Sequence, residues 1–187
     1  MIYASLKPIP RWRNRWVIPG YFALALATGL LLLAVVAPAR GLDGSALPLA
    51  AALATLVAGV LKLAYWREID AAPAAVTAEQ ATGLGRFGSV RLLEAPHTEE
   101  NYLMREMGYR IARKHAARLR SIALVLAFGL PTLAALAAAG LAGNGFGQSV
   151  LMLAGAVLAM AGVLIERWLF FAEAKHAVTL YYGASGV

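Results

Sequence analysis

Three long stretches without a charged residue limit what this chain can fold into: residues 16–39, 44–61 and 121–165. An α-helix needs about 20 predominantly apolar residues to cross a hydrocarbon core of about 30 Å, and each stretch is close to that length or longer. The whole sequence is 60% hydrophobic and 14% charged, whereas an average soluble domain has about 25% charged residues. Such a chain has too little charge to cover a water-exposed surface. The sequence therefore predicts an integral membrane protein and excludes a soluble or a disordered one.

The longest stretch exceeds one span and is interrupted at residues 143–147 by a glycine-rich cluster, which is typical of a turn. We therefore expect an all-α, polytopic helix bundle with about four membrane spans. Their expected bounds are 16–37, 44–66, 121–142 and 148–168, within one membrane domain over residues 1–187. Lys62 falls near the end of the second span, where a lysine is expected to extend its ammonium toward the lipid headgroups. Pro131 lies inside the third span, where neighbouring helices must compensate for the carbonyl that it leaves unbonded.

Positive charges are distributed unevenly between the segments that connect these spans. The residues before the first span and the loop at 67–120 are rich in lysine and arginine, whereas the two opposite loops offer only Arg40. Because basic loops stay on the cytoplasmic side, we expect both termini and the long loop to face the cytoplasm of a bacterial inner membrane. The first span has the basic start of a secretory signal, but its apolar stretch exceeds the roughly 7–15 residues of such signals. We therefore expect it to be retained.

The second half of the long loop has the pattern of an amphipathic helix. Thr98 is a suitable N-cap, acidic residues follow it in the first turn, and basic residues gather toward Arg120, which complements a helix dipole. Its apolar residues recur every four positions, at Leu103, Met107 and Ile111. This spacing predicts a helix lying on the membrane surface or against the bundle. We expect His97, Glu99, Glu100 and Asn101 to organise the cytoplasmic face.

Metal chemistry on this chain is not expected. The sequence has no cysteine, which excludes disulfides and iron–sulfur clusters held by this chain. Two Glu-x-x-His tetrads, Glu94…His97 and Glu173…His176, resemble half of a di-iron carboxylate site, but Pro96 breaks the helical geometry of the first one. The histidines also lack the placement on spanning helices that axial haem ligands need. No catalytic residue set is recognisable either.

The end of the last span carries the remaining chemical candidates. Glu166, Glu173 and His176 fall near one face if the helical period continues past Trp168, and ionisable groups inside or at the edge of a membrane are functional candidates because they are costly to bury. Together with Arg167 they are candidates for a quinol site or a proton path. The alternative is that this stretch is an interfacial helix whose aromatic residues form a membrane-interface belt.

Four segments together resemble the DmsC-like family of membrane-anchor subunits of dimethyl sulfoxide (DMSO) reductase-type complexes. They are MIYASLKPIPRW at 1–12, TGLGRFGSVRLL at 82–93, PHTEENYLMREMGYRIARKHA at 96–116 and ERWLFFAEAKHAVTLYY at 166–182. The resemblance implies an anchor that is not an enzyme by itself. Members of that family typically have about twice as many spans as we expect here, so the resemblance also implies that the chain corresponds to the C-terminal part of such an anchor.

The resemblance further implies a role in anaerobic respiration. The anchor would bind menaquinol transiently, oxidise it, and pass the electrons to an iron–sulfur subunit and then to a molybdopterin catalytic subunit, with no metal or haem of its own. The alternative from another class is a small membrane scaffold or transporter-like protein without redox function. Transporters usually show polar or broken helices near the bilayer midplane, and the first three spans offer little of that kind.

Overall fold

The computed structural model describes residues 2–94, 109–141, 145–184 and 186. Within these ranges, four helices are long and apolar enough to cross a membrane, and regular structure is helical throughout. They are α2 (Val17–Ala39), α3 (Leu47–Ala71), the continuous series α7 (Ala116–Leu124), η2 (Val125–Gly129) and α8 (Leu130–Gly140), and α9 (Gly145–Ala172). The predicted all-α bundle with four spans is therefore confirmed, and the protein is a multi-pass membrane protein.

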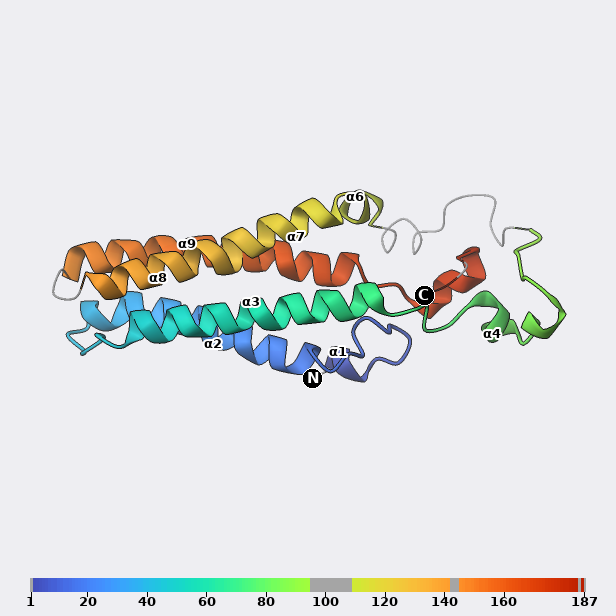
Figure 1. Cartoon of the computed structure of the whole chain (residues 1–187), viewed down its shortest axis with the longest axis horizontal. Coiled ribbons are helices and arrows are strands. Elements are labelled where there is room, and N and C mark those ends of the chain that lie inside the picture. Colours follow the sequence, from blue (N-terminus) through green and yellow to red (C-terminus); the bar gives the residue numbers. More distant parts are fainter. Residues whose placement is uncertain (1, 95–108, 142–144, 185, 187) are drawn as a thin grey trace.

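Both described ends of the chain and all the short elements lie at one end of the bundle, which we call the basic end (Figure 1). The short elements are α1 (Ile2–Ser5), α4 (Ala78–Thr82), η1 (Gly85–Phe87), α6 (Arg110–Lys114) and η3 (Ala177–Tyr182). An isolated antiparallel bridge joins Thr77 of the long loop to Gly186. The opposite end, which we call the turn end, has only the connections α2–α3 and α8–α9.

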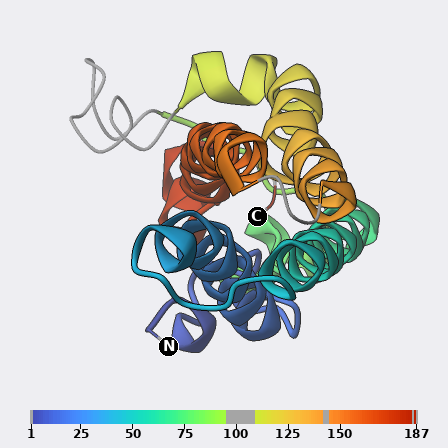
Figure 2. The same cartoon turned by 90° about the vertical axis from the view of Figure 1, so that its left-hand side faces the viewer.

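The four spans stand at the corners of a square when viewed along the bundle (Figure 2). Helix α2 packs beside α3 and α9, and α8 packs beside the same two helices. Helices α3 and α9 therefore face each other diagonally across the core. Short connections at the turn end make consecutive spans antiparallel, which is the usual consequence of a tight helix–helix turn.

Small residues fill the core near the turn end. The buried cluster there consists of Leu31, Ala34, Ala51, Ala52, Ala135, Ala138, Met152, Ala156 and Ala159. In a bilayer, lipid tails are as apolar as leucine, so helices associate through close packing of small residues. Aromatic side chains replace alanine toward the basic end, where Tyr65, Trp66 and Phe170 are buried together.

The proline of the third span is accommodated by the π-helical turn η2. Pro131 has no N–H, and its ring would clash with the carbonyl of Ala127 in a regular helix. The helix widens just before it, and the N–H of Leu130 donates to the carbonyl of Val125. Gly162 of α9 packs directly on this turn: a Cβ on Gly162 would lie 2.2 Å from the nitrogen of Ala127. The expected irregularity is thus a π-helical turn that α9 covers at backbone distance.

The structure changes the expected organisation of the loop. Residues 116–120 belong to the third spanning helix, because the helix starts at Ala116 rather than near 121. The short helix α6 is separated from it by His115, and Ile111 of the expected apolar stripe is 76% exposed. The remainder of the expected amphipathic helix, with His97, Glu99, Glu100 and Asn101, lies outside the described residues.

Candidate functional site

A buried ionic triad lies inside the bundle near its basic end. The carboxylate of Glu166 on α9 is completely buried, and Lys62 on α3 is 7% exposed. The ammonium of Lys62 pairs with Oε1 of Glu166. Arg167 donates from Nε to Oε2 of Glu166 and from Nη2 to Oε1, the latter at 2.7 Å. Both carboxylate oxygens therefore have charged partners.

Geometry explains why these residues meet. Lys62 precedes the end of α3 by about 14 Å of helical rise and Glu166 precedes the end of α9 by about 9 Å, since each residue adds about 1.5 Å. The two side chains therefore sit at similar depth on helices that face each other diagonally. The long lysine side chain bridges the core to reach the carboxylate. Lys62 was expected to extend toward the lipid headgroups, and this prediction is wrong because Glu166 provides a partner inside the bundle.

Aromatic rings surround both cations of the triad. The Lys62 ammonium lies 4.1 Å from the ring centroid of Tyr65 and 4.8 Å from that of Trp66. The Arg167 guanidinium lies 4.4 Å from the ring of Tyr21 and 4.8 Å from that of Phe170. Cation–π contacts stabilise positive charge without neutralising it. Two cations thus share one carboxylate, and the triad carries one net positive charge.

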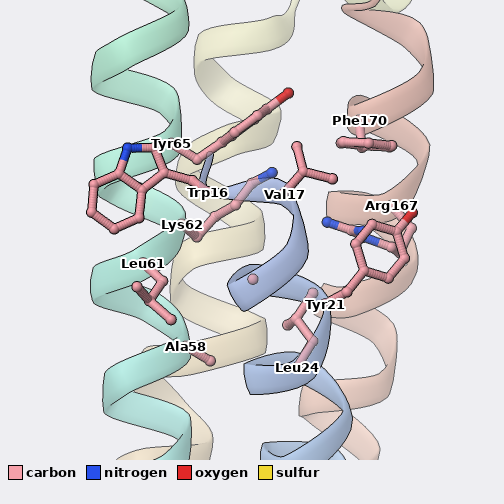
Figure 3. A pocket seen from close by; sticks show the side chains of 11 residues that line it. Trp16, Val17, Tyr21, Leu24, Ala58, Leu61, Lys62, Tyr65, Arg167 and Phe170 are labelled. Carbon is pink, nitrogen blue, oxygen red and sulfur yellow. The ribbon is translucent and has the colours of Figure 1, made fainter. Parts of the chain in front are cut away.

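A narrow hollow opens between α2, α3 and α9 beside the triad. Lys62 and Arg167 extend toward each other across it from α3 and α9 (Figure 3). It encloses about 310 Å³ between atoms, counting its open mouth, and its lining residues are Trp16, Val17, Gly20, Tyr21, Leu24, Ala58, Leu61, Lys62, Tyr65, Arg167 and Phe170. Nη1 of Arg167 is buried and, within the part of the chain that the structure describes, has no hydrogen-bond partner.

A second cluster of charges lies at the basic end itself. Arg120 on α7 donates to Asp70 at the end of α3, over 2.5 and 3.0 Å. Its other contact is an ion pair of 2.6 Å with Glu173, which is only 6% exposed. One guanidinium therefore ties together the ends of three spanning helices.

Cationic and indole N–H groups cover the carbonyls at the end of α9. Arg113 donates to the carbonyls of Ala172 and Ala174, both over 2.9 Å. Arg11 and Trp12, which precede the first span, donate to the carbonyls of Glu173 and Phe170. Burial lowers the pKa of Arg113 from its ordinary value, yet a guanidinium remains charged in proteins. These groups satisfy carbonyls that a helix end leaves open and complement its negative dipole end.

The structure divides the four residues predicted as quinol or proton-path candidates. Glu166 and Arg167 lie together in the triad, whereas Glu173 belongs to the outer cluster with Arg120. His176 joins neither: α9 ends at Ala172, so the helical period that was expected to carry His176 onto the same face stops before it. Instead, Nδ1 of His176 accepts a hydrogen bond from the N–H of Val178 at the start of η3.

Sequence reasoning missed the partners of these residues. Lys62 and Arg120 were interpreted as a headgroup contact and as part of a basic loop, although each pairs with a carboxylate of α9 or its end. A signal for Lys62 exists in the sequence, since Lys62 and Glu166 stand at matching distances from the ends of two antiparallel spans. In the described ranges, no group of three or more His, Cys, Asp or Glu residues is placed to hold a metal ion.

Comparison with known proteins relates the chain to a redox complex. The chain is 31% identical over 190 residues to a membrane-type component of the sulfite dehydrogenase of Allochromatium vinosum, and the match covers 97% of this chain and 54% of that relative. The chain therefore spans about half the length of the relative. No protein family model matches the sequence, and no solved structure matches it.

Proposed function

We propose that this chain is a membrane subunit of an oxidoreductase complex that exchanges electrons with the quinones of a bacterial inner membrane. The observation that carries the proposal is the similarity to a sulfite dehydrogenase component along nearly the whole chain. In its more specific form, the chain anchors a respiratory molybdoenzyme of the DMSO reductase type. It tethers an iron–sulfur subunit and a molybdopterin catalytic subunit and supports menaquinol oxidation in anaerobic respiration.

The basic end is the surface where these partners would dock. Its exposed cations include Lys7, Arg13, Arg15, Arg67, Arg86, Arg91, Lys114, Arg118 and Lys175. The turn end offers Arg40 beside Asp43, and the hydrogen bond from Ser45 lowers the pKa of Asp43, which keeps it ionised. Under the positive-inside rule, the basic end and both termini face the cytoplasm. Soluble redox partners with acidic surfaces would meet this end first.

The direction of electron flow separates two versions of the proposal. The resemblance to DMSO reductase-type anchors favours electrons leaving menaquinol. The relative's name favours the opposite direction, because a dehydrogenase takes electrons from sulfite and its membrane component would deliver them to a quinone. Both versions require a quinone beside the bundle and an electron-transfer partner at the basic end.

The test is purification of the tagged full-length chain from its native membranes, followed by measurement of molybdenum, iron and the proteins that co-purify. We expect molybdenum and iron in constant ratio to the chain. Replacing two exposed basic-end cations, Arg13→Glu with Lys114→Glu, should remove both metals from the preparation. The matched control Arg40→Glu changes a charge at the turn end and should leave them in place.

Two results would count against the proposal. A chain that purifies from native membranes without either metal has no such partners, which favours a scaffold or transporter-like protein without redox function. Equal loss of metal in the Arg40→Glu control would show that the basic end is not the docking surface.

A further inference from the structure

The unpaired nitrogen of Arg167 is the observation that most needs a ligand. Nη1 is buried, and the described residues give it no acceptor, although a buried donor without a partner loses the hydrogen bonds that it makes in water. Glu166 cannot supply the acceptor, because both of its oxygens are engaged by Lys62 and by the other nitrogens of Arg167. Arg167 lines the hollow between α2, α3 and α9. An oxygen atom entering that hollow would complete its hydrogen bonding.

The charge of the triad indicates which oxygen. Lys62 and Arg167 share the single carboxylate of Glu166, so one positive charge has only aromatic faces around it. Such a site favours an acceptor that carries partial or full negative charge. A ring carbonyl is such an acceptor, and so is the phenolate oxygen of a reduced ring.

The walls and depth of the hollow indicate what carries this oxygen. Its walls are mostly aromatic and aliphatic, with Trp16, Leu24 and Leu61 among them, and they suit a flat apolar ring. The triad lies about 9–14 Å of helical rise inside the ends of α9 and α3, at the level where aromatic belts mark the membrane interface. A ligand there can keep an apolar tail in the hydrocarbon region while its ring oxygen reaches the cations.

We propose that this hollow binds the headgroup of a membrane quinone, with one ring oxygen hydrogen-bonded to Nη1 of Arg167 and facing the Lys62 ammonium. This inference rests on the proposed function and assigns its quinone to a definite place. The hollow is narrow, so the ring enters when the half-buried side chain of Tyr21 turns aside. A phospholipid phosphate fits less well, because it would present three or four oxygens to a site with one unpaired nitrogen.

The test is a titration of the purified full-length chain, or of its complex, in nanodiscs with 2-methyl-1,4-naphthoquinone. Binding is followed by quenching of tryptophan fluorescence, since Trp16 lines the hollow. Gly20 also lines it, and a Cβ on Gly20 meets nothing within 4 Å. Gly20→Leu should therefore fold normally, occupy the hollow and weaken binding at least tenfold. Gly29 lies on the same helix outside the hollow with equally open surroundings, so Gly29→Leu is the matched control and should bind as the wild type does.

A second variant examines the hydrogen bond rather than the space. Arg167→Lys keeps the positive charge beside Glu166 but removes Nη1, and it should weaken binding about tenfold. Wild-type affinity in Gly20→Leu would overturn the proposed site, whatever Arg167→Lys does. Displacement of the naphthoquinone by phosphatidylglycerol added to the nanodiscs would overturn it too, because the hollow would then be a phosphate site.

These outcomes are separable from the fate of the proposed function. If the wild-type complex contains molybdenum and iron but Gly20→Leu binds the quinone unchanged, the function stands and the site is elsewhere. If the chain purifies without either metal, the oxidoreductase role fails, and the titration of the isolated chain still decides the site.

Discussion

The turn-end half of the bundle is packed from small residues, whereas the basic-end half holds aromatic rings and paired charges. Near the turn end, alanines let the helices approach closely, and that packing is what holds helices together in a bilayer. Near the basic end, a lysine, a glutamate and an arginine are buried among rings. Buried ion pairs contribute little net stability compared with apolar packing. The comparison indicates that the first half maintains the fold, while the second half is shaped for binding.

The largest effect is expected from breaking the triad at its carboxylate. Glu166→Gln leaves two buried cations without a counter-charge, and removal of one partner from a buried pair costs about 3–5 kcal/mol. The free energy of unfolding, measured by SDS titration in mixed micelles, should fall by about that amount. The double variant Glu166→Gln with Lys62→Met removes one stranded cation and should recover part of the loss. Equal stability of the single variant and the wild type would show that the triad is not buried as described.

A substitution of one methyl group should damage the packed half. In Gly162→Ala the added Cβ would overlap the backbone of η2 at Ala127, and overpacking of this kind costs typically about 1–3 kcal/mol. The same titration measures the loss. Gly29→Ala is the control, because its Cβ meets nothing within 4 Å. Similar stability of both variants would mean that α9 does not rest on the π-helical turn.

Removing a cap of α9 should have a smaller effect at the boundary of the binding half. Arg113→Met loses the hydrogen bonds to the carbonyls of Ala172 and Ala174, and a cation at a helix C-terminus contributes about 1 kcal/mol. We expect faster hydrogen exchange confined to residues near the end of α9, measured by mass spectrometry. Exchange that increases equally at the turn end would contradict a local role.

The smallest effect is expected from the exposed ion pair between Arg15 and Glu68. Arg15 is 75% exposed, and exposed pairs contribute little and are screened by salt. Glu68 also accepts hydrogen bonds from Asn14 and Trp16, so Arg15→Ala leaves it with partners. The unfolding midpoint should shift slightly at low salt and not at all at high salt. A large, salt-independent loss would mean that surface charge, not packing, holds this end together.

The sequence was sufficient for the spans and insufficient for the pairing inside them. Charge-free stretches determine where helices can cross a membrane, because each charge in hydrocarbon is costly. The partner of Lys62 depends instead on which helices stand diagonally, and the order along the chain does not state that. His176 shows the same limit: its spacing from Glu166 suggested one helical face, but α9 ends at Ala172. Pro131 was expected to disturb the third span, yet only the packing against Gly162 shows the form of the disturbance.

The most direct test of the account is whether this chain connects iron–sulfur clusters to membrane quinones. Native membranes with and without the chain would be reduced with dithionite, and the cluster signals followed by electron paramagnetic resonance after addition of 2-methyl-1,4-naphthoquinone. The account predicts that a set of clusters is re-oxidised rapidly when the chain is present and stays reduced when it is deleted, with Gly20→Leu between the two. Re-oxidation of the same clusters at the same rate without the chain would contradict it.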